Sequence, residues 1–230
     1  IIMKEEKTWF ETMDGSPQSD WFAERSYFSS PILFENATGF LDLVKQVCTE
    51  YIKIEKKQVK QKLKSTNDFG VIYQSGGLEK ISDLSQFVEY VGKRSWDFLD
   101  NQGFDLTKHN LIFKDMWYQE FPKEGGGVQE AHAHPNIHVS GFYFIESNDK
   151  STRPVFTDPR TGALMTKLPM KETKDICHAS TNINFIPQPG TLMIFNGYLP
   201  HAFPLVSGKE PFKFIHFNLQ AVPQGVINVV

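Results

Sequence analysis

The sequence predicts a mainly β-structured domain, a sandwich or barrel, with helices added in its N-terminal half. Aromatic residues make up 13% of the 230 residues, with 20 phenylalanines, and this class of side chain favours strands. From Leu111 onward, short apolar or alternating runs are separated by Gly, Pro, Asn and Asp, whereas the residues before Leu111 show helical periodicity. The length suits one large core. We therefore predict one structural domain, in which a helical N-terminal region, residues 1–110, packs on a β core of residues 111–230.

Two segments of the N-terminal region have the periodicity of amphipathic helices. In the first, Phe40 to about Lys64, apolar residues recur every three or four positions, and lysines crowd the C-terminal end, where the helix dipole favours cations. In the second, Leu84 to Leu99, the residues around Asp83 form a plausible capping box, and Gly103 follows as a stop. Both helices are expected to pack against the β core.

Seven segments of the C-terminal region have the composition of strands and lack helices between them, which is typical of a sandwich or barrel. They are Leu111 to Phe121, Ile137 to Ile145, Pro154 to Phe156, Ile183 to Ile186, Thr191 to Phe195, Ala202 to Val206 and Phe212 to Leu219.

Charge and cysteine content exclude several classes of protein. The formal net charge of −3 argues against binding to nucleic acid or to an anionic membrane surface, and no apolar run reaches the length of a membrane span. The two cysteines, Cys48 and Cys177, are too few for a disulfide framework. We expect a cytoplasmic protein that has no nucleic-acid or membrane partner.

A histidine pair and a later histidine form a candidate metal site. His132 and His134 are two residues apart, so on a strand both imidazoles point to the same side. His201 follows the apolar strand Thr191 to Phe195, and a neighbouring strand could bring it opposite the pair. A His-x-His pair alone is a weak pattern, because a pair that only lies on the surface or packs in the core is about as common as a metal-binding pair.

Further motifs follow the histidine pair in a fixed order. They are His132-Ala133-His134-Pro135, Ser140-Gly141-Phe142-Tyr143-Phe144, Asp158-Pro159-Arg160, Pro187-Gln188-Pro189-Gly190 with Phe195, His201, and Phe217-Asn218. In order and spacing they resemble the iron(II)- and 2-oxoglutarate-dependent oxygenases, over about residues 117–220. The resemblance implies a double-stranded β-helix, or jelly roll, with Fe(II) at its open end. It also implies a dioxygenase that uses 2-oxoglutarate and dioxygen, releases succinate and CO2, and hydroxylates or oxidises an unidentified substrate.

The resemblance implies that His132, His134 and His201 are the catalytic metal ligands. One departure concerns His134, because the wider superfamily commonly has a carboxylate at that position. A third neutral imidazole leaves the site one unit more positive than a site with two histidines and a carboxylate. Glu130 and Asp158 are the candidates for a carboxylate ligand, and three histidines are the preferred set.

The resemblance also implies a cation that pairs with the distal carboxylate of 2-oxoglutarate, because a buried charge without a partner is costly. Lys213 is the first candidate, since it follows His201 in the apolar strand Phe212 to Leu219. Arg160 is the second candidate cation. Tyr118 and Tyr143 could donate a hydroxyl hydrogen bond to the same carboxylate. His216, on the strand face opposite Lys213, is interpreted as a core or surface histidine with satisfied hydrogen bonds.

Two other functions remain open. A cupin-type dioxygenase or isomerase with three histidine ligands would share the barrel and need no 2-oxoglutarate, and a jelly-roll binding protein would have incidental histidines. The substrate could be a protein side chain or a small molecule.

Overall fold

The structure is a computed structural model that describes residues 28–63, 68–206 and 208–225. The chain divides into two compact units, Ile1–Ser30 and Pro31–Val230, and every element described below belongs to the second unit.

A six-stranded antiparallel sheet forms the larger layer, with the strand order β1-β8-β5-β10-β3-β2. Its strands are β1 (Ile32–Asn36), β2 (Tyr73–Gln74), β3 (His109–Glu120), β5 (Val139–Glu146), β8 (Thr191–Asn196) and β10 (Lys213–Pro223). A four-stranded antiparallel sheet forms the smaller layer, in the order β4-β9-β6-β7. It contains β4 (Gln129–His132), β6 (Val155–Thr157), β7 (Asn182–Asn184) and β9 (His201–Phe203).

The space between the two sheets is filled mainly by phenylalanine side chains. Phe142 and Phe144 on the large sheet belong to one buried cluster with Phe156 and Phe203 on the small sheet. Because side chains alternate along a strand, the residues between them, such as Tyr143, point to the opposite face of the large sheet. The large sheet is therefore buried on both faces, which explains why its strands are almost continuously apolar.

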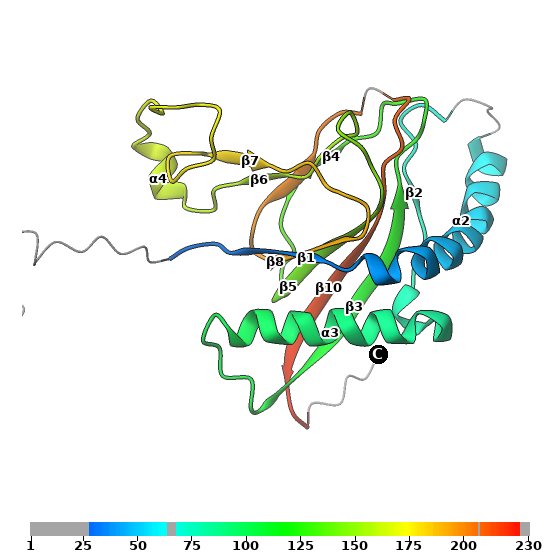
Figure 1. Cartoon of the computed structure of the whole chain (residues 1–230), viewed down its shortest axis with the longest axis horizontal. Helices are drawn as coiled ribbons and strands as arrows, with labels where there is room; N and C mark the ends of the chain where they lie inside the picture. The colour runs from blue at the N-terminus through cyan, green and yellow to red at the C-terminus, as the bar shows by residue number, and fades with distance from the viewer. Residues whose placement is uncertain (1–27, 64–67, 207, 226–230) are drawn as a thin grey trace, which may run out of the picture. The chain divides into compact units, whose positions relative to one another are not determined.

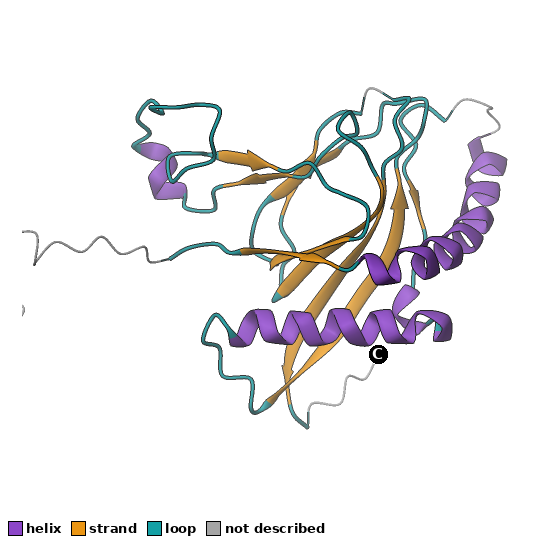
Figure 2. Cartoon of the chain, in the orientation of Figure 1, coloured by secondary structure: helices purple, strands orange, loops and turns teal. Residues whose placement is uncertain are grey.

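Helices cover the outer face of the large sheet (Figure 1; Figure 2). They are α2 (Leu41–Leu63) and α3 (Ser85–Asp100), and their apolar residues form one cluster with the outward-facing residues of the sheet. Shorter helical segments are the 3₁₀ turns η2 (Thr38–Phe40), η3 (Leu78–Lys80) and η4 (Ser82–Leu84) and the helix α4 (Thr161–Met165). The predicted all-β core with added helices is confirmed.

The large sheet also contains strands from the N-terminal region. β1 pairs with β8, and the two-residue strand β2 pairs with β3. The sequence analysis missed both, because β2 is too short for a periodic pattern and β1 lies beside a helical run. The division of the domain at residue 110 stays a prediction.

None of the helices in the described ranges is long and apolar enough to cross a membrane. Cys48 and Cys177 are both free thiols.

Candidate metal centre

Strand pairing brings His132 and His201 together. β4 and β9 are antiparallel neighbours, and their register places His132 directly opposite His201. His134 lies two residues beyond the end of β4, where its backbone N–H donates to the carbonyl oxygen of Gly197 at 2.9 Å. The predicted strand through both histidines therefore ends at His132, and the chain then turns through Asn136, which has a φ of 62°.

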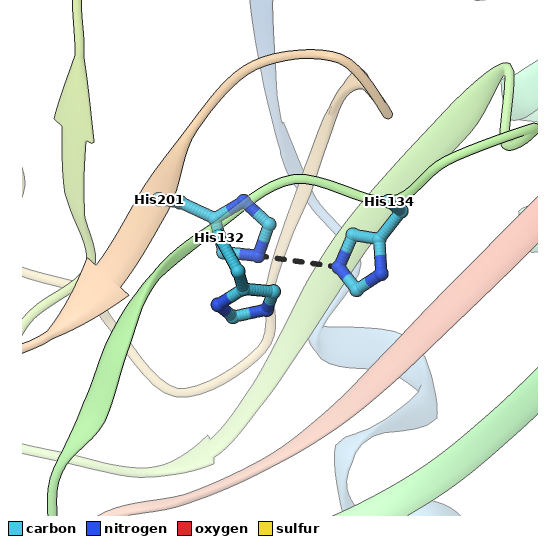
Figure 3. A group of neighbouring side chains, drawn as sticks. All are labelled: His132, His134 and His201. Carbon is cyan, nitrogen blue, oxygen red and sulfur yellow. Dashed lines mark hydrogen bonds between the residues drawn. The ribbon is translucent and has the colours of Figure 1, made fainter.

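The three imidazoles converge on one point (Figure 3). Each ring offers one nitrogen, and these three nitrogens all lie within 4.8 Å of one another. The Nε2 atoms of His134 and His201 are 3.3 Å apart. In the described ranges this is the cluster of histidine, cysteine or carboxylate side chains that has the spacing of a metal site.

Hydrogen bonds to backbone carbonyl groups determine which nitrogen carries the proton in two of the rings. Nδ1 of His132 is 2.8 Å from the carbonyl oxygen of Glu130, and Nδ1 of His201 is 3.0 Å from that of Leu199. Because a carbonyl oxygen only accepts, both Nδ1 atoms carry the proton, and in the neutral rings both Nε2 atoms keep a lone pair. Metal-binding histidines are oriented in this way by the hydrogen bond of their other nitrogen.

Burial keeps His134 and His201 neutral. Desolvation, together with the neighbouring imidazoles, lowers the pKa of His201 to about 3 and that of His134 to about 4. His201 is only 1% exposed, and its ring contacts the rings of Phe142, Phe156 and Phe195. Neutral imidazole is the form that binds a metal ion, so protonation does not compete with a metal ion for these two rings at neutral pH.

Neither candidate carboxylate joins the three histidines. Glu130 contacts His132 through its backbone carbonyl, and its side chain is exposed. The Asp158 carboxylate forms an ion pair with Arg160, with 2.8 Å between Oδ2 and Nη2. Three neutral imidazoles suit a divalent transition metal such as Fe(II), Ni(II) or Zn(II).

The structure does not bring Lys213 to the histidines. Lys213 alternates along β10 with Phe214, which belongs to the interior cluster, and shares parity with Ile215, which packs toward the helices. Its Nζ donates to the Glu146 carboxylate at 2.6 Å. Both faces of β10 are apolar, so the sequence pattern does not specify which of them faces the interior, and the role of Lys213 in binding 2-oxoglutarate stays a prediction.

The other proposed co-substrate residues also lie elsewhere. The Tyr143 hydroxyl donates to the carbonyl oxygen of Ala37 at 3.0 Å, on the helix side of the large sheet. Tyr118 belongs to the same cluster as Tyr143. Arg160 is exposed and holds Asp158.

His216 lies closer to the three histidines than the sequence predicted. It lies on the inner face of β10, with its ring centroid 4.9 Å from that of His134 and 6.0 Å from that of His201. It is 2% exposed, and within the described ranges its Nδ1 has no hydrogen-bond partner. Its parity with Phe214 and Asn218 was the pattern that could have placed it beside the metal site.

A chain of polar side chains extends from His134 into the large sheet. Asn218 lies with its Nδ2 3.5 Å from Nδ1 of His134 and donates from Nδ2 to the Asp115 carboxylate at 2.8 Å. The Ser140 hydroxyl donates to Oδ1 of Asn218 at 2.8 Å and lies 3.3 Å from Nε2 of His216. The serine and asparagine of two sequence motifs therefore meet behind the histidines.

Residues 115–218 match the family described as "Putative 2OG-Fe(II) oxygenase". This part of the chain, a little under half of its length, is similar to that family. The match contains the three histidines of the candidate metal centre, so the resemblance inferred from the motifs is confirmed. No curated protein matches this chain in sequence.

Solved structures with the same fold include three bacterial proteins. A Pseudomonas putida prolyl-4-hydroxylase is 10% identical to this chain, with 84% of this chain and 94% of that chain covered and a TM-score of 0.54. AviO1 from Streptomyces viridochromogenes Tue57 is 9% identical, with 83% and 90% covered and a TM-score of 0.53. HygX from Streptomyces hygroscopicus, solved with nickel and 2-oxoglutarate bound, is 8% identical, with 85% and 84% covered and a TM-score of 0.52. At these identities the likeness concerns the fold, and it confirms the double-stranded β-helix.

Proposed function

We propose that the oxygenase holds Fe(II) with His132, His134 and His201 and, with 2-oxoglutarate and dioxygen, hydroxylates or oxidises a second substrate. The observation that carries the proposal is the convergence of three neutral imidazoles, two of them with Nε2 lone pairs aimed at one point. The family of residues 115–218 supports the identity of the metal and the co-substrate. When bound, Fe(II) supplies the oxidising chemistry in which 2-oxoglutarate is converted to succinate and CO2.

The chain's own residues provide orientation and shielding. The carbonyl groups of Glu130 and Leu199 hold two of the rings with Nε2 toward the metal position. Phenylalanine side chains surround His201 and exclude water from its side of the centre. A dry and preorganised site strengthens the interaction between the metal and its ligands.

A second candidate is a dioxygenase or isomerase with three histidine ligands that does not use 2-oxoglutarate. It is favoured by one observation: in the described ranges, no lysine or arginine is among the buried residues. The interior beside the histidines is lined by phenylalanines, which give the distal carboxylate of 2-oxoglutarate no counterion.

Succinate formation separates the two candidates. The purified protein, supplied with Fe(II), 2-oxoglutarate and dioxygen but no second substrate, should release succinate slowly through uncoupled turnover. Mass spectrometry should detect succinate in the complete mixture and not in mixtures that lack Fe(II) or 2-oxoglutarate. Stoichiometric iron binding without succinate and without 2-oxoglutarate binding would favour the second candidate. A protein that binds no metal would be the non-catalytic jelly roll.

Lys213 is tested by a substitution that keeps its apolar stem. Since its ammonium group pairs with Glu146 on the helix side, Lys213→Met should leave the 2-oxoglutarate concentration for half-maximal succinate release unchanged within about twofold. The free energy of unfolding should fall by less than about 1 kcal/mol, because both partners are partly exposed. If Lys213 instead anchors 2-oxoglutarate, as the sequence suggested, that concentration will rise roughly tenfold to a hundredfold.

A further inference from the structure

The third histidine differs from the other two in what fixes its proton. His132 and His201 each donate from Nδ1 to a backbone carbonyl. Nδ1 of His134 instead faces the side-chain amide of Asn218, which is 3% exposed. An amide has a donor end and an acceptor end, so the orientation of Asn218 decides which nitrogen of His134 carries the proton.

Asp115 and Ser140 set the orientation of this amide. The ionised Asp115 carboxylate can only accept, and it is 2.8 Å from Nδ2 of Asn218. The Ser140 hydroxyl donates to the oxygen at the other end. The NH2 group of Asn218 is therefore the end that faces His134.

This orientation is consistent with a metal-free site. Nδ1 of His134 accepts from Asn218, so the proton of the neutral ring is on Nε2, where it can be donated to Nε2 of His201 at 3.3 Å. His201 has its own proton on Nδ1, bound to Leu199, so its Nε2 is able to accept. Every proton in this chain of contacts has an acceptor.

A metal ion at the same point needs a different arrangement. It needs the lone pair of His134 on Nε2, which moves the proton of the neutral ring to Nδ1. Two donors then face each other, Nδ1–H of His134 and the NH2 group of Asn218. A flip of the Asn218 side-chain amide, which exchanges its oxygen and its NH2 group, gives the Nδ1–H of His134 an acceptor. The same flip breaks the hydrogen bond of Asn218 with Asp115.

We propose that Asn218 is the positioning residue of His134, and that Asp115 holds it in the orientation that opposes metal binding. This inference rests on the proposed metal centre. Metal binding requires the side-chain amide of Asn218 to rotate, and its hydrogen bond with Asp115 sets the free-energy cost of that rotation. Because Asp115 is exposed, its carboxylate can form a hydrogen bond with water in place of the one with Asn218. The free-energy cost of the rotation is therefore modest.

The test compares Zn(II) binding by the wild-type protein and by Asp115→Asn. An amide at this position can either donate or accept, so Asn218 can turn without losing its partner. The dissociation constant for Zn(II), measured by competition with a chelator, should decrease by about tenfold. The matched control is Asp97→Asn on α3, where the carboxylate pairs with Lys93 and Arg94, and there the constant should not change.

A second readout needs no substitution. Nitrogen-15 spectra of the wild-type imidazoles should show the His134 proton on Nε2 without metal and on Nδ1 with Zn(II). A proton on Nδ1 in both states, or equal dissociation constants for the wild type and Asp115→Asn, would overturn the inference and leave the metal centre in place. Failure of the wild-type protein to bind Zn(II) would overturn the metal centre and the inference together.

Discussion

His201→Ala should remove most of the bound iron. His201 is the most buried of the three rings, and its Nδ1 is held by the carbonyl oxygen of Leu199, so its Nε2 is fixed toward the other two histidines. A metal site that loses one of three protein ligands is expected to lose more than about a hundredfold in affinity, since even loss of a partner behind a ligand costs 10- to 100-fold. Iron per protein after dialysis at neutral pH measures the effect.

The control for this variant is His178→Ala, which removes an exposed imidazole outside the cluster. It should retain iron and succinate release at wild-type levels. Wild-type iron stoichiometry in His201→Ala would show that His201 is not a ligand, even if turnover falls.

Gly141→Ala should unfold the protein or bring it close to unfolding. A Cβ atom at this position would lie 2.3 Å from Cζ of Phe217 and 2.4 Å from the backbone oxygen of Met193. β5 lies between β8 and β10, and Phe217 is fully buried, so neither neighbour can move without disturbing the large sheet. The free energy of unfolding, measured by urea denaturation, should fall by about 3 kcal/mol or more, a large share of the 5 to 15 kcal/mol typical of a domain.

Gly162→Ala is the matched control. The same substitution on α4 meets no atom within 4 Å, so stability should change by less than about 0.5 kcal/mol. A loss of similar size in both variants would mean that the contacts of Gly141 are not the cause.

The strands and the histidine cluster were predictable because they depend on local patterns. Alternation and turn residues place β5, β8 and β10 within a few residues of their observed bounds. The helices α2 and α3 likewise lie where their periodicity placed them, although Lys64, the predicted end of the first helix, is outside the described residues. His132 and His201 meet because one strand pair brings them into register.

The residues that line the interior of the barrel were harder to predict, because they depend on which face of each strand points inward. β10 is apolar on both faces, so the sequence pattern does not specify whether Lys213 or His216 faces the interior, and in the structure His216 does. The contact of Asn218 with Asp115 joins residues 103 positions apart, and only the register of β10 against β3 brings them together. Such contacts follow from sheet register, which a single sequence does not specify.

The strand β4 makes few contacts with the rest of the fold. It is an edge strand of the small sheet, none of its four residues is buried, and neither apolar cluster includes any of them. Two of the three candidate ligands nevertheless lie on β4 or just beyond it. A segment with so few apolar contacts opens at a small fraction of the free energy of global unfolding. A metal ion bound at the proposed centre would therefore add the strongest contacts that this edge makes, and we expect its release to require only the local opening of β4.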